Sequence, residues 1–239
     1  KSSYNSPGAD YGIENSPTVY RNLMYTIDNG GTLLCLDINK LEPVWMYDVQ
    51  DDTDSTIVLE EEEDGVFIYT ANEVDKRCAG GKASKADCNI RKFNALTGEL
   101  IWQRDYTCYY RSGINGGVLG TPLLGKDDIA DRIIFPVCFT GSQMDGKLVA
   151  LDKKTGEEIW VRQLANYSWS SPVAVRSDDG KTYGLLCGYD GYMRLFDPMT
   201  GEDLDKVSLG VNIESSPSVY NDIAVVGSYS QKIFGVRIK

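Results

Sequence analysis

Short runs of alternating hydrophobic and polar residues fill this chain, and turns rich in Gly, Asp and Pro separate them. Alternation with a period of two is typical of half-buried β-strands. One clear series of such runs lies at 172–175, 182–187 and 192–196, followed by a last run after a turn at 198–201. Asp-Gly pairs at 64–65, 145–146 and 190–191 suit tight hairpin turns. No stretch has a helical period, so the pattern predicts an all-β chain of four-stranded antiparallel units.

The four-stranded unit recurs along the chain. The sequence Leu-Val-Ala-Leu-Asp-x-x-Thr-Gly-x-x-x-Trp at 148–160 returns in altered form at 89–102, at 191–205 without its Trp, and at 31–45 without its Thr-Gly. Tandem units of ~40–45 residues are typical of a β-propeller, in which each unit is one blade. We predict four full blades and one partial blade, at about 13–50, 51–106, 107–164, 165–210 and 211–239.

This repeat resembles the PQQ-type, quinoprotein-like propeller repeat, from about residue 15 to the end of the chain. The resemblance implies that the Trp docks one blade onto the next and that the Asp and Thr-Gly hold the outer turn. These structural roles fall on Trp45, Trp102, Trp160, Asp37, Asp152, Asp197, Thr97, Thr155 and Thr200. The family contains quinone-dependent alcohol dehydrogenases and an outer-membrane assembly lipoprotein, so the resemblance is specific for the fold and weak for function.

The number of blades leaves three arrangements open. The resemblance implies a ring of seven or eight blades. Eight blades would need ~340 residues, whereas the chain has 239. Residues 1–239 are therefore the C-terminal part of a longer propeller, an arc that missing blades or another chain completes, or a single five-bladed domain. Residues 1–12 make a poor strand for closing the last blade. We favour the truncated propeller.

Charge and composition exclude several classes of function. Asp and Glu number 35 against 24 Lys and Arg, a net charge of −11, which argues against a nucleic-acid partner. The absence of His removes Ser/His and Cys/His nucleophile pairs and His-ligated zinc. No apolar run approaches ~18 residues, so we predict no transmembrane segment. A protein or cell-surface partner is the expectation that remains.

The six cysteines are compatible with an oxidising compartment. Cys78 and Cys88 bracket a Gly-rich insertion, and we predict a disulfide between them, with a reduced pair as the alternative. Cys35, Cys138 and Cys187 lie among apolar strand residues and are expected to be small buried hydrophobes. Cys108 is a second, weaker candidate to pair with Cys138.

In a propeller, the loops that precede the innermost strands form one rim. Here they are 12–15, 51–54, 109–117, 166–169 and 211–214. An aromatic platform with an Arg and carboxylates can hold a planar anion, a sugar or a peptide end. We select Arg111, Asn115, Trp169 and Glu214 as ligand-binding candidates. The acidic run 60–64 is interpreted as a solvated hairpin tip, and we predict no metal site and no catalytic residue.

Our first hypothesis is a non-enzymatic, PQQ-like propeller that acts as an extracytoplasmic binding or assembly scaffold without a cofactor. A PQQ- and calcium-dependent dehydrogenase is the alternative that the family resemblance implies. A third hypothesis is carbohydrate or cell-surface ligand binding by the aromatic rim. The dehydrogenases of the family carry adjacent cysteines, which this sequence lacks, and it also lacks His and a spaced set of calcium acids. The extracytoplasmic location rests on the family habit and the predicted disulfide.

Overall fold

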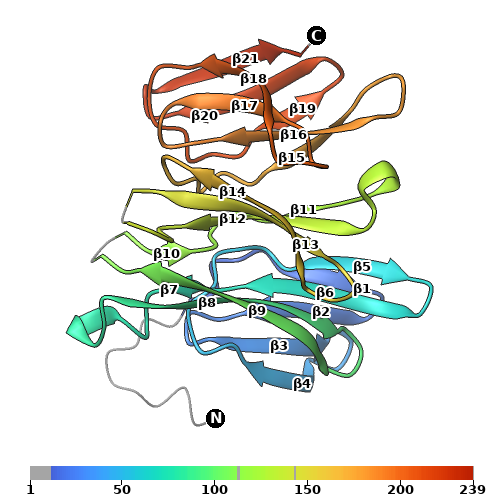
Figure 1. The fold of residues 1–239 in the computed structure, drawn as a ribbon. Helices are drawn as coiled ribbons and strands as arrows, with labels where there is room; N and C mark the ends of the chain where they lie inside the picture. The colour runs from blue at the N-terminus through green and yellow to red at the C-terminus, as the bar shows by residue number, and fades with distance from the viewer. Residues whose placement is uncertain (1–11, 112–113, 143, 239) are drawn as a thin grey trace. The chain divides into compact units, whose positions relative to one another are not determined.

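The computed structural model describes residues 12–111, 114–142 and 144–238. They fall into two compact units, Lys1–Val118 and Leu119–Lys239, and both are built from antiparallel sheets joined by short turns (Figure 1). We call them unit 1 and unit 2 and describe each by itself.

Unit 1 contains two four-stranded sheets in which each strand pairs with its neighbours in chain order. The first sheet consists of β1 (Thr18–Tyr20), β2 (Leu23–Ile27), β3 (Thr32–Asp37) and β4 (Glu42–Asp48). The second consists of β5 (Val58–Glu62), β6 (Gly65–Ala71), β8 (Lys85–Asn94) and β9 (Leu100–Tyr109). A short strand β7 (Glu73–Val74) leaves the end of β6 and pairs with β10 (Gly116–Gly117). A turn of 3-10 helix, η2 (Ala79–Gly81), lies in the insertion before β8.

Unit 2 contains three sheets. The first holds β11 (Leu123–Leu124), β12 (Arg132–Cys138), β13 (Gly146–Asp152) and β14 (Glu158–Leu164), with a 3-10 turn η3 (Asp127–Ile129) between β11 and β12. The second holds β15 (Val173–Arg176), β16 (Thr182–Cys187), β17 (Tyr192–Phe196) and β18 (Asp203–Ser208). The third has three strands, β19 (Ser218–Tyr220), β20 (Ile223–Ser228) and β21 (Lys232–Arg237).

The predicted all-β class and the four-stranded antiparallel sheets are confirmed, and so is a last sheet with fewer strands. The inner strands β6 and β12 are buried along nearly their whole length, whereas the edge strand β18 is exposed. In unit 1 the cluster around Tyr25, Ile68 and Phe93 joins its two sheets, and in unit 2 a cluster that contains Leu186 and Phe196 joins β12–β14 to β15–β18. Membership of all five sheets in one ring stays a prediction.

Two of the repeat Trp side chains lie against the outer turn of the following sheet. The indole N–H of Trp45 donates to the backbone carbonyl of Ala95 at 2.9 Å, and that of Trp160 donates to Pro198 at 2.9 Å. A Cβ on Gly201 would lie 2.6 Å from the Trp160 ring, so a side chain at this turn would displace the indole. Trp102 is buried and packs against Tyr69 within its own sheet.

Side-chain carboxylates stabilise the outer turns. Asp152 Oδ1 accepts hydrogen bonds from the backbone N–H groups of Lys154 at 2.9 Å and Thr155 at 2.8 Å. Asp197 Oδ1 accepts one from the backbone of Met199 at 2.8 Å. An Asp at the start of the turn thus satisfies N–H groups that the strands leave unpaired.

The predicted Cys78–Cys88 disulfide is wrong. All six cysteines lie in the described part of the chain, all are buried, and none forms a disulfide, with Cys108 and Cys138 likewise unbonded to each other. The insertion is closed by Arg77 instead, which donates to the Asp51 carboxylate at 2.7 Å and to the backbone carbonyl of Asp87. These polar contacts hold the loop without a disulfide. Cys35, Cys138 and Cys187 are small buried side chains, as expected. Among the described residues, no helix is long and apolar enough to cross a membrane.

Candidate functional site

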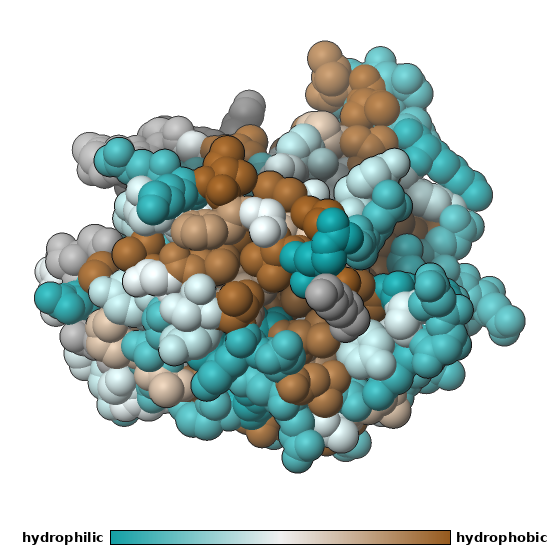
Figure 2. All heavy atoms as spheres, turned by 90° about the horizontal axis from the view of Figure 1, so that it is seen from above, coloured by the Kyte–Doolittle hydropathy of each residue, from teal (hydrophilic) through white to brown (hydrophobic). Residues whose placement is uncertain are grey.

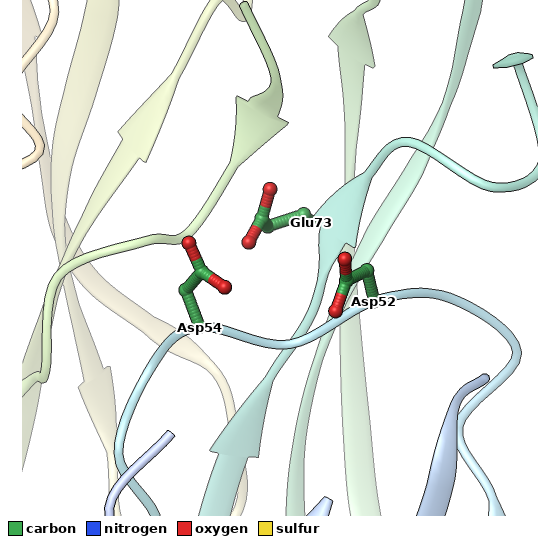
Figure 3. Close-up of side chains that lie close together, drawn as sticks. All are labelled: Asp52, Asp54 and Glu73. Carbon is green, nitrogen blue, oxygen red and sulfur yellow. The ribbon is translucent and has the colours of Figure 1, made fainter. Parts of the chain in front are cut away.

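Three carboxylates from separate segments of unit 1 meet at one point. Asp52 and Asp54 lie in the loop between β4 and β5, and Glu73 begins β7 immediately after β6. One oxygen of each lies within 4.8 Å of the others. Figure 3 shows the three side chains facing a common space between loop and strand. We call these three residues the acidic cluster.

Backbone contacts fix the position of the acidic cluster. The backbone N–H of Glu73 donates to the carbonyl of Asp52 at 2.8 Å, which ties β7 to the loop. On the other side of Glu73 lies Gly117 in β10, with φ +94. A Cβ on Gly117 would lie 2.8 Å from the carbonyl oxygen of Asn72, so only glycine permits both this backbone conformation and this close approach.

Asp51 shows how the same loop treats a carboxylate with a structural role. It accepts hydrogen bonds from the backbone N–H groups of Asp52 at 3.0 Å and Lys76 at 2.6 Å, and from the Arg77 guanidinium at 2.7 Å. A buried carboxylate with several donors and a cationic partner is electrostatically satisfied. Asp51 is therefore an anchor for the insertion and not a free ligand.

The acidic cluster has no comparable set of donors. Asn115 Nδ2 donates to Glu73 Oε2 at 2.9 Å, and the backbone N–H of Thr53 donates to Asp52 at 2.7 Å. Glu73 is only 1% exposed, yet its Oε1 has no hydrogen-bond partner, and the same holds for Asp54 Oδ1 and Thr53 Oγ1. Within the described residues, no Lys or Arg forms an ion pair with any of the three carboxylates.

Burial disfavours the charged form of every member of the cluster. It raises the pKa of Asp52 to about 6, and repulsion from Glu14 and other nearby carboxylates adds to the effect. Burial also raises the pKa of Asp54, with Glu14 as a further cause, and that of Glu73, where the Asp54 charge is the second cause. A positive charge placed among these oxygens would reverse this balance.

A second polar arrangement lies in unit 2, around Tyr167. Its ring stacks on Tyr189 with centroids 4.7 Å apart and contacts Trp169 at 5.1 Å and the edge of Phe139 at 4.8 Å. Offset and tilted contacts of this kind are favourable for aromatic rings. Tyr167 is buried, whereas Trp169 is half-buried and Tyr189 exposed.

Glu214 completes this aromatic arrangement. It accepts hydrogen bonds from the Tyr229 hydroxyl at 2.5 Å, from Asn212 Nδ2 at 2.8 Å and from the Tyr167 hydroxyl at 3.4 Å. The hydrogen bond to Glu214 raises the pKa of Tyr229, because ionisation would place two negative charges together. We call Tyr167, Trp169, Tyr189, Glu214 and Tyr229 the aromatic cluster.

The candidates selected from the sequence divide between these two places. Trp169 and Glu214 both contact Tyr167 in unit 2. Asn115 binds Glu73 in unit 1, while Arg111 is exposed and pairs through its backbone with Ile114. Residues 112–113 of the same rim segment lie outside the described residues.

Sequence reasoning missed the acidic cluster. The Asp-x-Asp pattern at 52–54 is visible in the rim loop, but Glu73 is brought to it by the pairing of β7 with β10 and by the backbone hydrogen bond from Glu73 to Asp52. We expected no set of calcium-binding acids because we considered only their spacing along the chain. The pair of acids at 52 and 54, directly before a blade start, was the feature that could have indicated the cluster.

The family model described as "Outer membrane protein assembly factor BamB" matches residues 6–183 and again 86–239, almost the whole chain. The chain belongs to this family of PQQ-like repeat proteins. The resemblance drawn from the Asp, Thr-Gly and Trp positions of the repeat is thereby confirmed.

Relatives in the family carry two different names. An outer membrane protein assembly factor BamB from Kangiella koreensis is 24% identical over 160 residues, covering 52% of this chain and 39% of the relative. A quinoprotein ethanol dehydrogenase from Pseudomonas aeruginosa is 25% identical over 153 residues, covering 63% of this chain and 23% of the relative. The chain thus spans well under half the length of these relatives.

Solved structures show the same fold. The crystal structure of BamB from Moraxella catarrhalis has a TM-score of 0.62 at 17% identity, covering 96% of this chain and 63% of that one. Quinohemoprotein alcohol dehydrogenase from Comamonas testosteroni has a TM-score of 0.64 at 13% identity, covering 95% and 41%. The β-propeller prediction is confirmed as a fold class by these neighbours.

The two cofactors that the dehydrogenase branch implies fit the described residues differently. PQQ is a planar quinone with several carboxylates, and both clusters present carboxylates to a ligand, so they would repel it. The buried oxygens of Asp54 and Glu73 that lack hydrogen-bond partners suit a hard cation such as calcium. Neither cluster therefore suits the quinone, and the acidic cluster is the place where calcium fits.

Proposed function

We propose that the chain is part of a non-enzymatic, PQQ-like β-propeller that acts as a binding or assembly scaffold outside the cytoplasm. The observation that carries the proposal is the aromatic cluster, which presents Tyr189 and Tyr229 on the surface of unit 2 around the Glu214 carboxylate. Aromatic residues are enriched where proteins bind one another, because they bury a large area with few rotatable bonds.

Further apolar surface lies on the last sheet of the same unit. Ile233 in β21 is 80% exposed, Tyr229 is 67% exposed, and Val225 in β20 is also exposed. Figure 2 looks at the molecule from above, the side on which β21 lies in Figure 1. Hydrophobic residues gather there between hydrophilic ones. Exposed apolar patches with a polar border favour a protein partner over a small polar ligand.

The other parts of the proposal have separate support. The chain has no His and no adjacent cysteines, and its clusters repel an anionic quinone, which favours a scaffold over an enzyme. The extracytoplasmic location is supported by a relative whose name places it in outer membrane protein assembly. Within the described residues the last sheet has three strands and β21 lies at its edge, so a strand from elsewhere in the protein or from another chain could complete this blade.

Site-specific photo-crosslinking in the source cell tests the scaffold role. A photo-reactive amino acid is placed at Tyr229 in the full-length protein, with the exposed Glu63 of unit 1 as the matched control position. We expect one protein adduct at position 229 that is lost on Trp169→Ala and absent at position 63. A glycan adduct would favour the carbohydrate hypothesis instead, and equal adducts at both positions would contradict specific docking.

The dehydrogenase remains a second candidate, because relatives are named quinoprotein ethanol dehydrogenases and the acidic cluster suits calcium. Reconstitution of the full-length protein with PQQ and calcium separates the two functions. A scaffold gives no reduction of a dye by primary alcohols. Turnover that requires both additions would overturn the non-enzymatic proposal.

A further inference from the structure

We propose that the acidic cluster of Asp52, Asp54 and Glu73 is a calcium site that binds the ion without a quinone. This inference is independent of the scaffold role, because it concerns an ion held inside unit 1. It rests on geometry, on buried oxygens without donors, and on the chemistry of the ligand set.

The spacing of the oxygens suits a single ion. Calcium binds oxygen ligands at 2.3–2.6 Å, so two ligands of one ion lie at most about 5 Å apart. The three carboxylate oxygens of the cluster lie within 4.8 Å of one another. One calcium ion between them would contact all three after small side-chain movements, with water completing its shell.

Oxygens without donors point to a missing positive charge. Glu73 Oε1 lies on a side chain that is 99% buried and aimed at the other carboxylates, and it has no hydrogen-bond partner (Figure 3). Asp54 Oδ1 and Thr53 Oγ1 are also buried without partners. Leaving such groups unsatisfied is costly, and the donors described above, Asn115 Nδ2 to Glu73 and the backbone N–H of Thr53 to Asp52, do not reach these oxygens.

The ligand chemistry selects a hard cation. The cluster consists of three carboxylates, with the Asn115 amide bound to Glu73 and no thiol among its members, and the whole chain contains no His. Zinc and copper sites draw on His and Cys, whereas calcium prefers carboxylate and carbonyl oxygens. The anchoring of β7 by Gly117 and of the loop by Asp51 holds these oxygens in place before an ion arrives.

Isothermal titration of the metal-stripped chain with calcium chloride at pH 7.5 tests the site. We expect one ion per chain, with a dissociation constant of about 10⁻⁵–10⁻³ M, in the range of calcium modules. The variant D54N/E73Q keeps the size of both side chains and removes two negative charges, and it should weaken binding at least about tenfold, since carboxylate charge sets calcium affinity. The matched control, E63Q/D64N, removes two exposed acids of the β5–β6 turn and should leave binding within about twofold.

Each outcome decides the proposal. Far-UV circular dichroism and thermal unfolding show whether D54N/E73Q folds, and the single variant Asp54→Asn repeats the test with a smaller change. No heat of binding with the wild-type chain would overturn the site. It would mean that protons shared between the carboxylates, and not calcium, neutralise the cluster. Equal affinity in the wild type and in folded D54N/E73Q would place calcium elsewhere. Neither result bears on partner docking in unit 2.

Discussion

The two ends of the β5–β6 hairpin carry acidic groups that the protein treats in opposite ways. Near the turn, Glu62 pairs with Lys92 Nζ at 2.7 Å, and Glu60 accepts a hydrogen bond from Tyr69 at 3.2 Å. Lys92 is 3% exposed and also lies 4.0 Å from the centre of the Phe67 ring. At the other end, the acidic cluster has no ion pair within the described residues. The chain therefore supplies its own cation at one end of the hairpin and leaves that charge to a ligand at the other.

The largest effect is expected where the cation belongs to the chain. The change Lys92→Met keeps the apolar stem and removes the charge, which leaves the Glu62 carboxylate without its ion-pair partner. Breaking a buried ion pair costs about 3 kcal/mol in the free energy of unfolding, measurable by urea denaturation. A loss under about 1 kcal/mol would show that this end of the hairpin is balanced by solvent.

Calcium should stabilise the chain to a slightly smaller extent. An ion at a hundred times its dissociation constant adds about 2.7 kcal/mol to the free energy of unfolding, or about 5 °C in Tm for a chain of this size. Differential scanning calorimetry with calcium and with excess EDTA measures the shift. The D54N/E73Q variant should show none, while Lys92→Met should keep the full shift at its lower Tm. A shift of equal size in all three would mean that calcium acts elsewhere.

The pH dependence of the metal-free chain follows from the raised pKa of Asp52. Below about pH 3 the group is protonated in both the folded and the unfolded state and contributes nothing. As the pH rises toward about 6, the unfolded state loses the proton while the folded state keeps it, so stability decreases by about 2 kcal/mol. Above that pH the loss is complete. The charged groups that act on Asp52 are Glu14, Asp75 and Asp51, and Arg77 is bound to Asp51.

Denaturation of the EDTA-treated chain at pH 4.5 and pH 7.5 measures this loss. The E63Q/D64N variant should keep the full loss, whereas D54N/E73Q should reduce it, because fewer like charges then oppose the ionisation of Asp52. Stability that increases over this range in the wild type would contradict the repulsion we describe.

The smallest effect is expected from Asp54→Asn alone. Without metal at pH 7.5, the change removes a buried negative charge and adds an N–H donor facing Glu73, so it should raise the free energy of unfolding by about 1 kcal/mol. With calcium the sign should reverse, because a ligand charge is lost. Urea denaturation in the two buffers reads out both values, and a variant that is destabilised equally in both would have lost packing and not charge balance.

Much of the fold was predictable because strands and tight turns are encoded locally. The alternation at 192–196 and the Asp-Gly turn before it fix β17 and its hairpin without reference to distant residues. The Trp positions of the repeat also indicated the family to which the chain belongs. The Cys78–Cys88 pairing failed because the sequence does not show that Arg77 reaches both Asp51 and Asp87.

The site was less accessible because its parts come from separate elements. The acidic run 60–64 was expected to be a solvated tip, and Glu61 and Glu63 are exposed. Glu60 and Glu62 nevertheless turn toward Tyr69 and Lys92, and that pairing depends on the register of β6 and β8. The same holds for Glu73, whose distance from Asp52 is set by β10 and by a backbone hydrogen bond that no local pattern announces.

Hydrogen exchange with and without calcium compares the two ends of the hairpin most directly. We predict that calcium slows exchange of the backbone amides at 51–55 and 72–76, which frame the acidic cluster. Exchange at 60–64, where Lys92 already supplies the charge, should stay unchanged. Protection at 60–64, or no protection at either end, would contradict the claim that one end of this hairpin is built to receive a cation.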